Sequence, residues 1–539
     1  MLFHSLEFQG IFVVHWYNRR ELVTLEHLYK ITKRLHFSVL ILFFLSVFII
    51  FSKMLGDLKK CCVIIPQRWI FALMCFLALF NAYAMRACLS IAITEMVVPI
   101  TVPEAVQDET CPSMDVKLPI NQTKHFEGTY EWDEYTQGLI LSSFYWGYII
   151  THLPGGMIAD KYGGKYTLGI GILLTAIFTL LTPLAVYWGE SNALIALRIL
   201  MGLGEGTTYP AINVLLAQWT PPEERSRTGS FVYAGALIGT IYATMVSGLI
   251  LYYSNTGWPT VFYVIGTTSI IWFVIWLLAC YNNPRDHPFI SIDEVNYLKE
   301  RMSKHTHDEP SSVPWKLILM SKPLWAVIIA LIGFNWSILT IVTDLPKYMS
   351  GVLKFSVQNN GYLTSFVYLC MWIGGTASSC LADYLITKDY ASITQVRKLG
   401  SILALPASAS FIVAASYAGC DRVLVIGMFT IAMLLMGTAF PSVMVNALDL
   451  SPNYAGTLMA LTNGLSALTG IASPYIIGII TPNQTLSEWR LVFWILFGMS
   501  VISNLIFLKY GSGKVEDWND PKFIRVRSRK RESFEEINM

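Results

Sequence analysis

Two arginines stand out because they lie inside long apolar stretches, where a charge is costly. Arg86 lies 18 residues after Arg68 in the first such stretch, and Arg198 lies 21 residues before Trp219 in another. A charge near the centre of a spanning helix costs at least ~2.5 kcal/mol, so it is a functional candidate. Because a helix rises about 1.5 Å per residue, both guanidiniums are expected at similar depth, where they could bind a carboxylate or phosphate.

Glu205 and His152 are candidates for coupling to a driving ion. Glu205 follows Arg198 by seven residues, so the two side chains are predicted on one helix face, as a pair that could take and release a proton. His152 lies in a different apolar stretch, and imidazole titrates near neutral pH, which suits a proton relay. Structural alternatives stay open: an ion pair that joins helices, and a histidine bonded to a backbone carbonyl.

The segment 155–165, GGMIADKYGGK, ends one apolar stretch and turns into the next. Its small residues allow helix backbones to approach closely, and Asp160 can cap a helix or pair with a base. We interpret it as a gating motif, carried by Gly156, Asp160, Gly163 and Lys165. Asp344, and Asn446 with Asp449, are polar groups at helix ends, where ordinary capping is favoured over cation binding. No metal site is predicted.

The composition identifies lipid as the solvent around these residues. Hydrophobic residues make up 54% of the 539 and charged residues only 14%, against roughly 25% charged in soluble proteins. The apolar residues come in runs of about 20, which match the hydrocarbon core of a bilayer and must be helical. The net charge of +2 does not indicate a nucleic-acid partner. Neither the clustered residues of an enzyme nor the charged ring of a channel is present.

We therefore predict an all-α polytopic membrane protein with twelve core helices in two six-helix bundles, without a cofactor. The expected parts are a variable N-terminal segment 1–65, a first bundle 66–280, a linker 281–322, a second bundle 323–510 and a basic tail 511–539. The short apolar run 37–51 is interpreted as part of an appended segment, with Met54 as an alternative start, or else as an interfacial helix.

Basic residues are concentrated in the linker, in the loops on its side and in the tail, which contains the run RVRSRKR. The positive-inside rule therefore places the linker and both termini in the cytoplasm. Two N-glycosylation triplets begin at Asn121 and Asn483, and both fall in loops on the opposite side. A third triplet at Asn335 lies inside an expected helix and is discounted.

The two halves repeat each other. The segments 206–210 and 437–441 share the pattern G-T-x-aromatic-P, and each is followed by a proline eleven residues later. Ala159-Asp160 with Lys165 recurs as Ala382-Asp383 with Lys388. Duplicated bundles that enclose a site near the bilayer midplane are typical of transporters that work by rocking of the halves.

These residues also carry a family resemblance. The segments YAMRACLSIAI, WDEYTQGLILSSFYWGYIITHLPGGMIADKYGGK, LRILMGLGEGTTYPA, QWTPPEERSR and GWPTVFYVIGT resemble the anion-cation symporter family of the major facilitator superfamily. That family includes sialin, vesicular glutamate transporters and type I sodium-phosphate cotransporters, and the likeness is greatest to insect putative inorganic phosphate cotransporters. The resemblance covers about residues 66–510. It implies substrate-anion roles for Arg86 and Arg198 and a charge-coupling role for Glu205.

The resemblance implies Na⁺- or H⁺-driven symport of inorganic phosphate or an organic anion by a monomer. The alternative is a proton-coupled exporter of acidic sugars or acidic amino acids. The expected location is the plasma membrane or a lysosomal or vesicular membrane. The chain departs from sialin-like members at Met201, where they have Glu, and from vesicular glutamate carriers at Leu141 and Phe334, where they have His and Arg. These departures count against vesicular glutamate loading.

Overall fold

The computed structural model describes residues 66–98, 111, 128–221, 224–254, 257–303, 313–451 and 454–520. The expectations for Asn121, for the N-terminal segment 1–65 and for the basic run of the tail lie outside these residues. The described residues from Arg68 onward belong to one compact unit.

The first half consists of helices that match the expected apolar stretches. They are α2 (Gln67–Met96), α3 (Glu134–Tyr162), α4 (Gly164–Glu205), α5 (Thr208–Trp219), α6 (Arg225–Tyr253) and α7 (Pro259–Ala279). Within α4 the backbone leaves helical geometry at Gly189 and Glu190, which divides it into two spans. The second of these spans continues into α5 after a short turn.

The linker contains η2 (Pro284–Asp286), α8 (Ile292–Ser303) and α9 (Trp315–Met320). The second half follows, and several of its helices are interrupted by π-helical or 3-10 segments. It comprises α10 (Lys322–Lys347), η3 (Tyr348–Val352), α11 (Val357–Thr387), α12 (Ile393–Ile402), η4 (Leu403–Ala407), α13 (Ser408–Tyr417), α14 (Arg422–Met436), η5 (Gly437–Ala439), η6 (Phe440–Met444), α15 (Asn446–Leu450), α16 (Ala455–Ser466), α17 (Thr469–Ile480), α18 (Leu486–Tyr510) and η7 (Asp517–Asn519).

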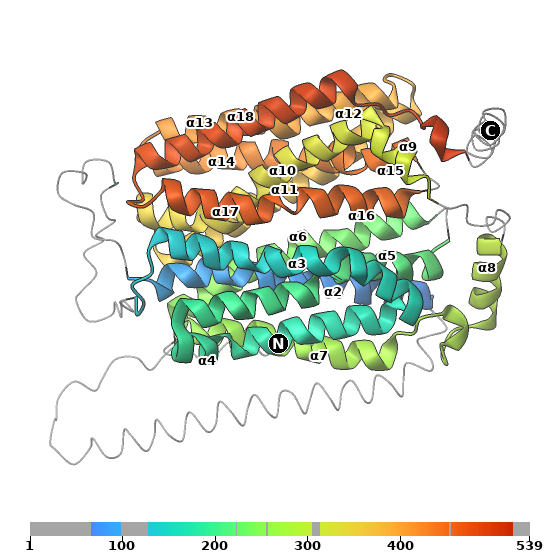
Figure 1. Cartoon of the computed structure of the whole chain (residues 1–539), viewed down its shortest axis with the longest axis horizontal. Helices are drawn as coiled ribbons and strands as arrows, with labels where there is room; N and C mark the ends of the chain where they lie inside the picture. The colour runs from blue at the N-terminus through green and yellow to red at the C-terminus, as the bar shows by residue number, and fades with distance from the viewer. Residues whose placement is uncertain are drawn as a thin grey trace, which may run out of the picture. The chain divides into compact units, whose positions relative to one another are not determined.

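The described helices account for twelve spans. Ten helical stretches are long and apolar enough to cross a membrane. One of them, Gly164–Trp219, has 56 residues and holds two spans separated at Gly189. The ten stretches therefore hold eleven spans. The helix α3, which has 29 residues and is not among the ten, is the twelfth, as predicted. Figure 1 shows these helices side by side, with blue-to-green helices in one group and yellow-to-red helices in the other.

The repeat seen in the sequence is confirmed as a structural repeat. An added Cβ at Gly206 would lie 2.4 Å from the carbonyl oxygen of Tyr148 in α3, and one at Gly437 would lie 2.4 Å from that of Met371 in α11. Both glycines stand where a helix ends, α4 at Glu205 and α14 at Met436. The glycine therefore permits the same close helix contact in each half.

The two halves meet along α3 with α17 and along α6 with α11. Gly248 of α6 faces Gly361 of α11 so closely that a Cβ on either glycine would lie 2.9 Å from the Cα of the other. Nearby, the hydroxyl oxygens of Thr244 and Ser365 are 2.8 Å apart. Small residues thus let the backbones of the two halves touch.

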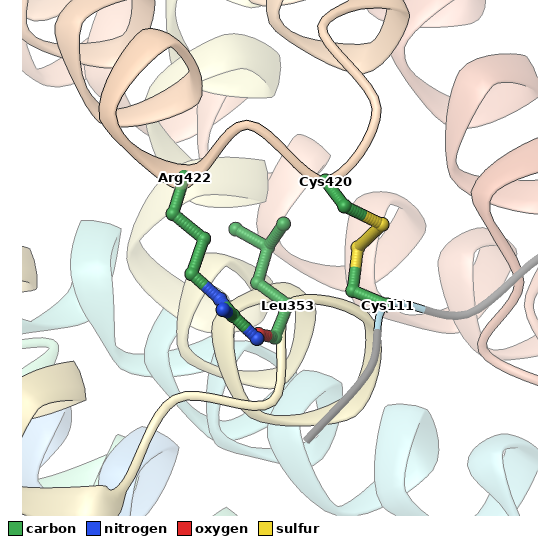
Figure 2. The surroundings of a disulfide bond; sticks show 4 residues. All are labelled: Cys111, Leu353, Cys420 and Arg422. Atoms are coloured by element: carbon green, nitrogen blue, oxygen red, sulfur yellow. A yellow bond between two sulfur atoms is a disulfide. The ribbon is translucent and has the colours of Figure 1, made fainter. Parts of the chain in front are cut away.

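A disulfide joins Cys111, which follows α2, to Cys420, which lies between α13 and α14, across 309 residues (Figure 2). The Cys111 amide donates a hydrogen bond to the Val352 carbonyl at 3.2 Å. Arg422 Nε donates to the neighbouring Leu353 carbonyl at 3.0 Å, as Figure 2 shows. The bond therefore fastens a loop of the first half to the second half.

Candidate functional site

Arg86 of α2 forms an ion pair with Glu205, the last residue of α4. Both side chains are buried, with 10% and 2% of their surface exposed. The sequence predicted that Glu205 would pair with Arg198, and that prediction was wrong. Spacing along α4 places Arg198 and Glu205 on one face, but the partner that reaches the carboxylate comes from another helix.

Four aromatic rings surround the guanidinium of Arg86. Its Cζ lies 4.5 Å from the ring centre of Tyr83, 4.7 Å from Phe144, 5.1 Å from Tyr148 and 5.6 Å from Tyr145. The negative faces of aromatic rings attract a cation and exclude water from it. The aromatic cage, as we call these four residues, thus holds the Arg86 side chain from the sides that Glu205 leaves open.

Arg198 is buried, and no carboxylate of the described residues forms an ion pair with it. Only 3% of its surface is exposed, and its Cζ lies 4.9 Å from the ring centre of Phe144. Among the described residues, neither its Nε nor its Nη1 has a hydrogen-bond partner. Burying an ion without a counter-ion is costly, so this guanidinium is poised to accept an anion. Phe144 contacts both arginines and thereby brings them to one place.

His152 lies beside this site but its ring is engaged with the backbone. Its Nδ1 is 3.2 Å from the carbonyl oxygen of Gly206, and the ring stacks on Tyr148 at 5.2 Å. The contact is the structural alternative considered from the sequence. Because Gly206 directly follows Glu205, the histidine also fixes the turn that carries the carboxylate.

Several tyrosines complete the site and were missed from the sequence. The hydroxyl of Tyr83 lies 3.0 Å from that of Tyr209, whose ring stacks on Tyr233 at 5.8 Å. Tyr145 packs against α17, where an added Cβ at Gly470 would lie 2.4 Å from its ring. The only sequence signal was the i, i+3 spacing of Tyr145 and Tyr148, which is common in apolar helices. The site therefore borders the seam between the halves.

The gating motif lies at the far end of α3. Gly163 has φ 92°, and an added Cβ would lie 2.4 Å from the Asn282 amide nitrogen. Asn282 Oδ1 accepts a hydrogen bond from the Lys165 amide at 2.9 Å, and the Lys165 ammonium lies 4.5 Å from the Tyr281 ring centre.

At Gly156 of the same motif, an added Cβ would make only an ordinary contact at 3.5 Å, so the close approach between helices occurs at Gly155 instead. The Asp160 side chain is outside the described part.

The remaining polar candidates have structural partners. Asp449 accepts two hydrogen bonds from Arg397, at 2.7 and 3.1 Å, and a third from the Asn446 amide at 3.2 Å. The Asn483 side chain donates to Glu488 at 3.0 Å. Within the described ranges, no group of three or more His, Cys, Asp or Glu residues could hold a metal ion.

Residues 75–474 match the protein family described as the Major Facilitator Superfamily. The chain belongs to this superfamily of membrane transporters. It is 40% identical to human sialin over 85% of this chain and 91% of that protein. It is 38% identical to a putative inorganic phosphate cotransporter of Drosophila ananassae, over 83% and 93%. Identity to human vesicular glutamate transporter 2 is 32%, over 86% and 77%.

Solved structures confirm the fold. A bacterial homolog of the human lysosomal transporter Spinster aligns with a TM-score of 0.61 at 13% identity, over 83% of this chain and 97% of that one. A D-xylose-proton symporter aligns with a TM-score of 0.60 at 16% identity, over 83% and 100%. The twelve-helix major facilitator fold and the transporter class predicted from the sequence are therefore confirmed, and the chain is a multi-pass membrane protein.

Proposed function

We propose that this superfamily member moves a small anion by ion-coupled symport, with Arg198 as the principal anion-binding residue. The observation that carries the proposal is the buried Arg198 guanidinium, which has unpartnered Nε and Nη1 atoms, beside an Arg86 that is already neutralised by Glu205. Each of these two nitrogens forms a two-nitrogen fork with Nη2, so an arriving carboxylate or phosphate would supply the missing acceptor and could bind on either fork in bidentate geometry.

Arg86 and Glu205 would serve as the coupling unit. While the pair is intact, the positive charge of Arg86 and the negative charge of Glu205 neutralise each other. A proton or Na⁺ that neutralises Glu205 would free Arg86 to bind the anion. The substrate would then meet two guanidiniums instead of one. Release of the ion would restore the pair and weaken anion binding, which links the two transport events.

The names of the relatives suggest which anions to try. Inorganic phosphate and glutamate appear in those names, and the chain shares 38% and 32% identity with the respective proteins. We propose phosphate or an organic anion as the substrate. Export of acidic sugars or acidic amino acids from lysosomes or vesicles is the second candidate, because the identity to sialin reaches 40%.

The proposed topology puts the 281–322 linker in the cytoplasm and the loop that contains Cys111 on the opposite side. The disulfide between Cys111 and Cys420 supports this orientation, because such bonds persist in oxidising compartments and are rare in the cytosol. The side that carries this disulfide is called the outer side below. It would face the exterior at the plasma membrane or the lumen of an organelle.

The test is uptake of labelled phosphate, sialate, glutamate and urate into vesicles that contain the purified protein. Sodium and pH gradients are imposed separately, so that substrate and driving ion are read independently. The proposal expects accumulation of at least one anion, driven by one of the two gradients and lost in an Arg198→Ala variant. Accumulation of none of the four anions under either gradient, or accumulation that persists unchanged in Arg198→Ala, would contradict it.

A further inference from the structure

A second buried ion pair joins the two halves on the outer side. Glu134 is the first residue of α3 and Lys347 is the last residue of α10. The Lys347 ammonium lies 3.2 Å from Glu134 Oε2 and 3.7 Å from Asp344 Oδ1. The side chains of the three residues are 7%, 5% and 0% exposed in the order Glu134, Lys347 and Asp344. Helix ends usually face water, so this burial needs a cause.

The cause is that backbones from the two halves touch around the pair. An added Cβ at Gly138 of α3 would lie 2.4 Å from the Pro474 carbonyl oxygen of α17. One at Gly478 of α17 would lie 2.5 Å from the carbonyl oxygen of Glu134 itself. No side chain separates α3 from α17 at these points. The ion pair therefore lies in a closed seam between the halves.

Asp344 belongs to the same half as Lys347, whereas Glu134 belongs to the other half. Asp344 lies in the same helix as Lys347, one turn earlier, and accepts a hydrogen bond from Thr343. Glu134 belongs to the other half, where Gln137 donates to its Oε1 at 3.0 Å. When the halves move apart on the outer side, Lys347 keeps Asp344 and loses Glu134. Among the described residues, the side chain that Glu134 then keeps as a partner is the amide of Gln137.

We propose that Glu134 and Lys347 form the outer latch of the transport cycle, with Asp344 retaining the Lys347 ammonium when the latch opens. These are positioning residues: they contact no substrate and set the balance between the sealed and the open outer side. The proposal rests on the alternating access of the proposed function. In the sealed state the two charges compensate each other, and opening replaces that contact with water. Removal of Glu134 leaves Lys347 paired with Asp344 alone, within its own half, and removal of Lys347 strands both carboxylates in the seam, so either change favours opening.

The test measures how often the seam opens, which needs no knowledge of the substrate. Ser142 is fully buried on the face of α3 that also carries Gly138 and Tyr145, so Ser142→Cys is reachable from the outer side only through the open seam. A membrane-impermeant thiol reagent is added on that side of the full-length protein in vesicles. The labelling rate is corrected for the same protein without the introduced cysteine.

We expect labelling to accelerate roughly fivefold or more in Glu134→Gln and in Lys347→Met, because each shifts the equilibrium toward the open state. Glu131→Gln is the matched control, because it removes the same charge three residues earlier from an exposed side chain. It should leave the rate within about twofold of the parent. Parental rates in both latch variants would overturn the proposal.

Two further variants decide the matter if a single change prevents folding. Glu134→Gln and Lys347→Met combined with Asp344→Asn remove all three charges of the cluster and leave no buried charge without a partner, so this triple variant should fold and still label faster than the parent. Glu134→Asp keeps the charge and shortens its reach, and its rate should fall between those of the parent and Glu134→Gln. Folded protein with parental labelling in these two variants would show that the pair is only structural, independently of whether Arg198 binds an anion.

Discussion

Arg86 and Glu205 form an ion pair between α2 and the end of α4, although 119 residues separate them. The pair lies directly beside Arg198, since Phe144 contacts both guanidiniums at 4.7 and 4.9 Å. Within the described residues, one arginine is therefore neutralised by a carboxylate and the other is not. This asymmetry is the basis for assigning coupling to the first and anion binding to the second.

Glu205→Gln should separate coupling from binding. A neutral amide cannot cycle its charge, so gradient-driven accumulation should fall to background while exchange between equal substrate pools continues. Tracer uptake with and without an imposed ion gradient measures both. If the pair is only structural, the variant should instead lose folded protein and activity in proportion, because a stranded buried Arg86 costs ~3–5 kcal/mol.

Gly202→Ala should destabilise the contact between α3 and α4. The added Cβ would lie 2.0 Å from the Phe144 carbonyl oxygen, so one helix backbone must shift, at a cost of about 1–3 kcal/mol. Gly427→Ala is the control, because nothing lies within 4 Å of its added Cβ and alanine favours a helix. Melting temperatures of the purified variants should fall for Gly202→Ala and stay level or rise for Gly427→Ala.

Loss of the disulfide should reduce stability without abolishing transport. The bond closes a long loop, and removal of such a bond typically costs ~2–5 kcal/mol. Cys111→Ser and Cys420→Ser should lower the melting temperature equally, and the double variant should resemble either one. Unequal or additive effects would show that the two cysteines are not partners in the mature protein.

The pH dependence of stability should include a contribution from His287 in the linker. Burial lowers the pKa of His287 below its ordinary value of 6.5, and the nearby Lys165 ammonium lowers it further, while the Ala279 carbonyl and Glu294 act in the opposite direction. Folding therefore favours the neutral ring. The resulting stability is present above pH 6.5 and is lost as the pH falls through the lowered folded-state pKa.

His287→Gln, which cannot gain this charge, tests that contribution. Melting temperatures at pH 7.5 and 5.5 are compared for the parent and the variant. The parent should lose more stability on acidification than the variant does. An equal loss in both proteins would mean that His287 is not responsible.

Much of the architecture could be predicted from the sequence because lipid imposes strong rules. The length of each apolar run predicted a span, and the repeat around Gly206 and Gly437 predicted the corresponding helices. The division of α4 at Gly189 and Glu190 likewise separates two apolar runs. These signals are local, or they recur at a fixed distance, so a single sequence displays them.

Contacts between distant helices could not be predicted in the same way. The spacing of Arg198 and Glu205 indicated a shared face, but the partner of Glu205 came from α2 and depended on how the helices cross. The pairing of Cys111 with Cys420 also depends on the fold, because 309 residues separate the two cysteines. Glu134 and Lys347 gave no signal as a pair, because each alone looked like an ordinary charge at a helix end.

The measurement that tests the central claim most directly is anion transport by Arg198→Lys. Lysine keeps the positive charge but lacks the planar fork that binds a carboxylate or phosphate through two parallel hydrogen bonds. With Arg422→Lys as a control on the outer side, initial rates are compared at equal amounts of protein in the membrane. The account predicts a KM raised about tenfold or more, or no transport, for Arg198→Lys alone. A parental KM and maximal rate in that variant would contradict it.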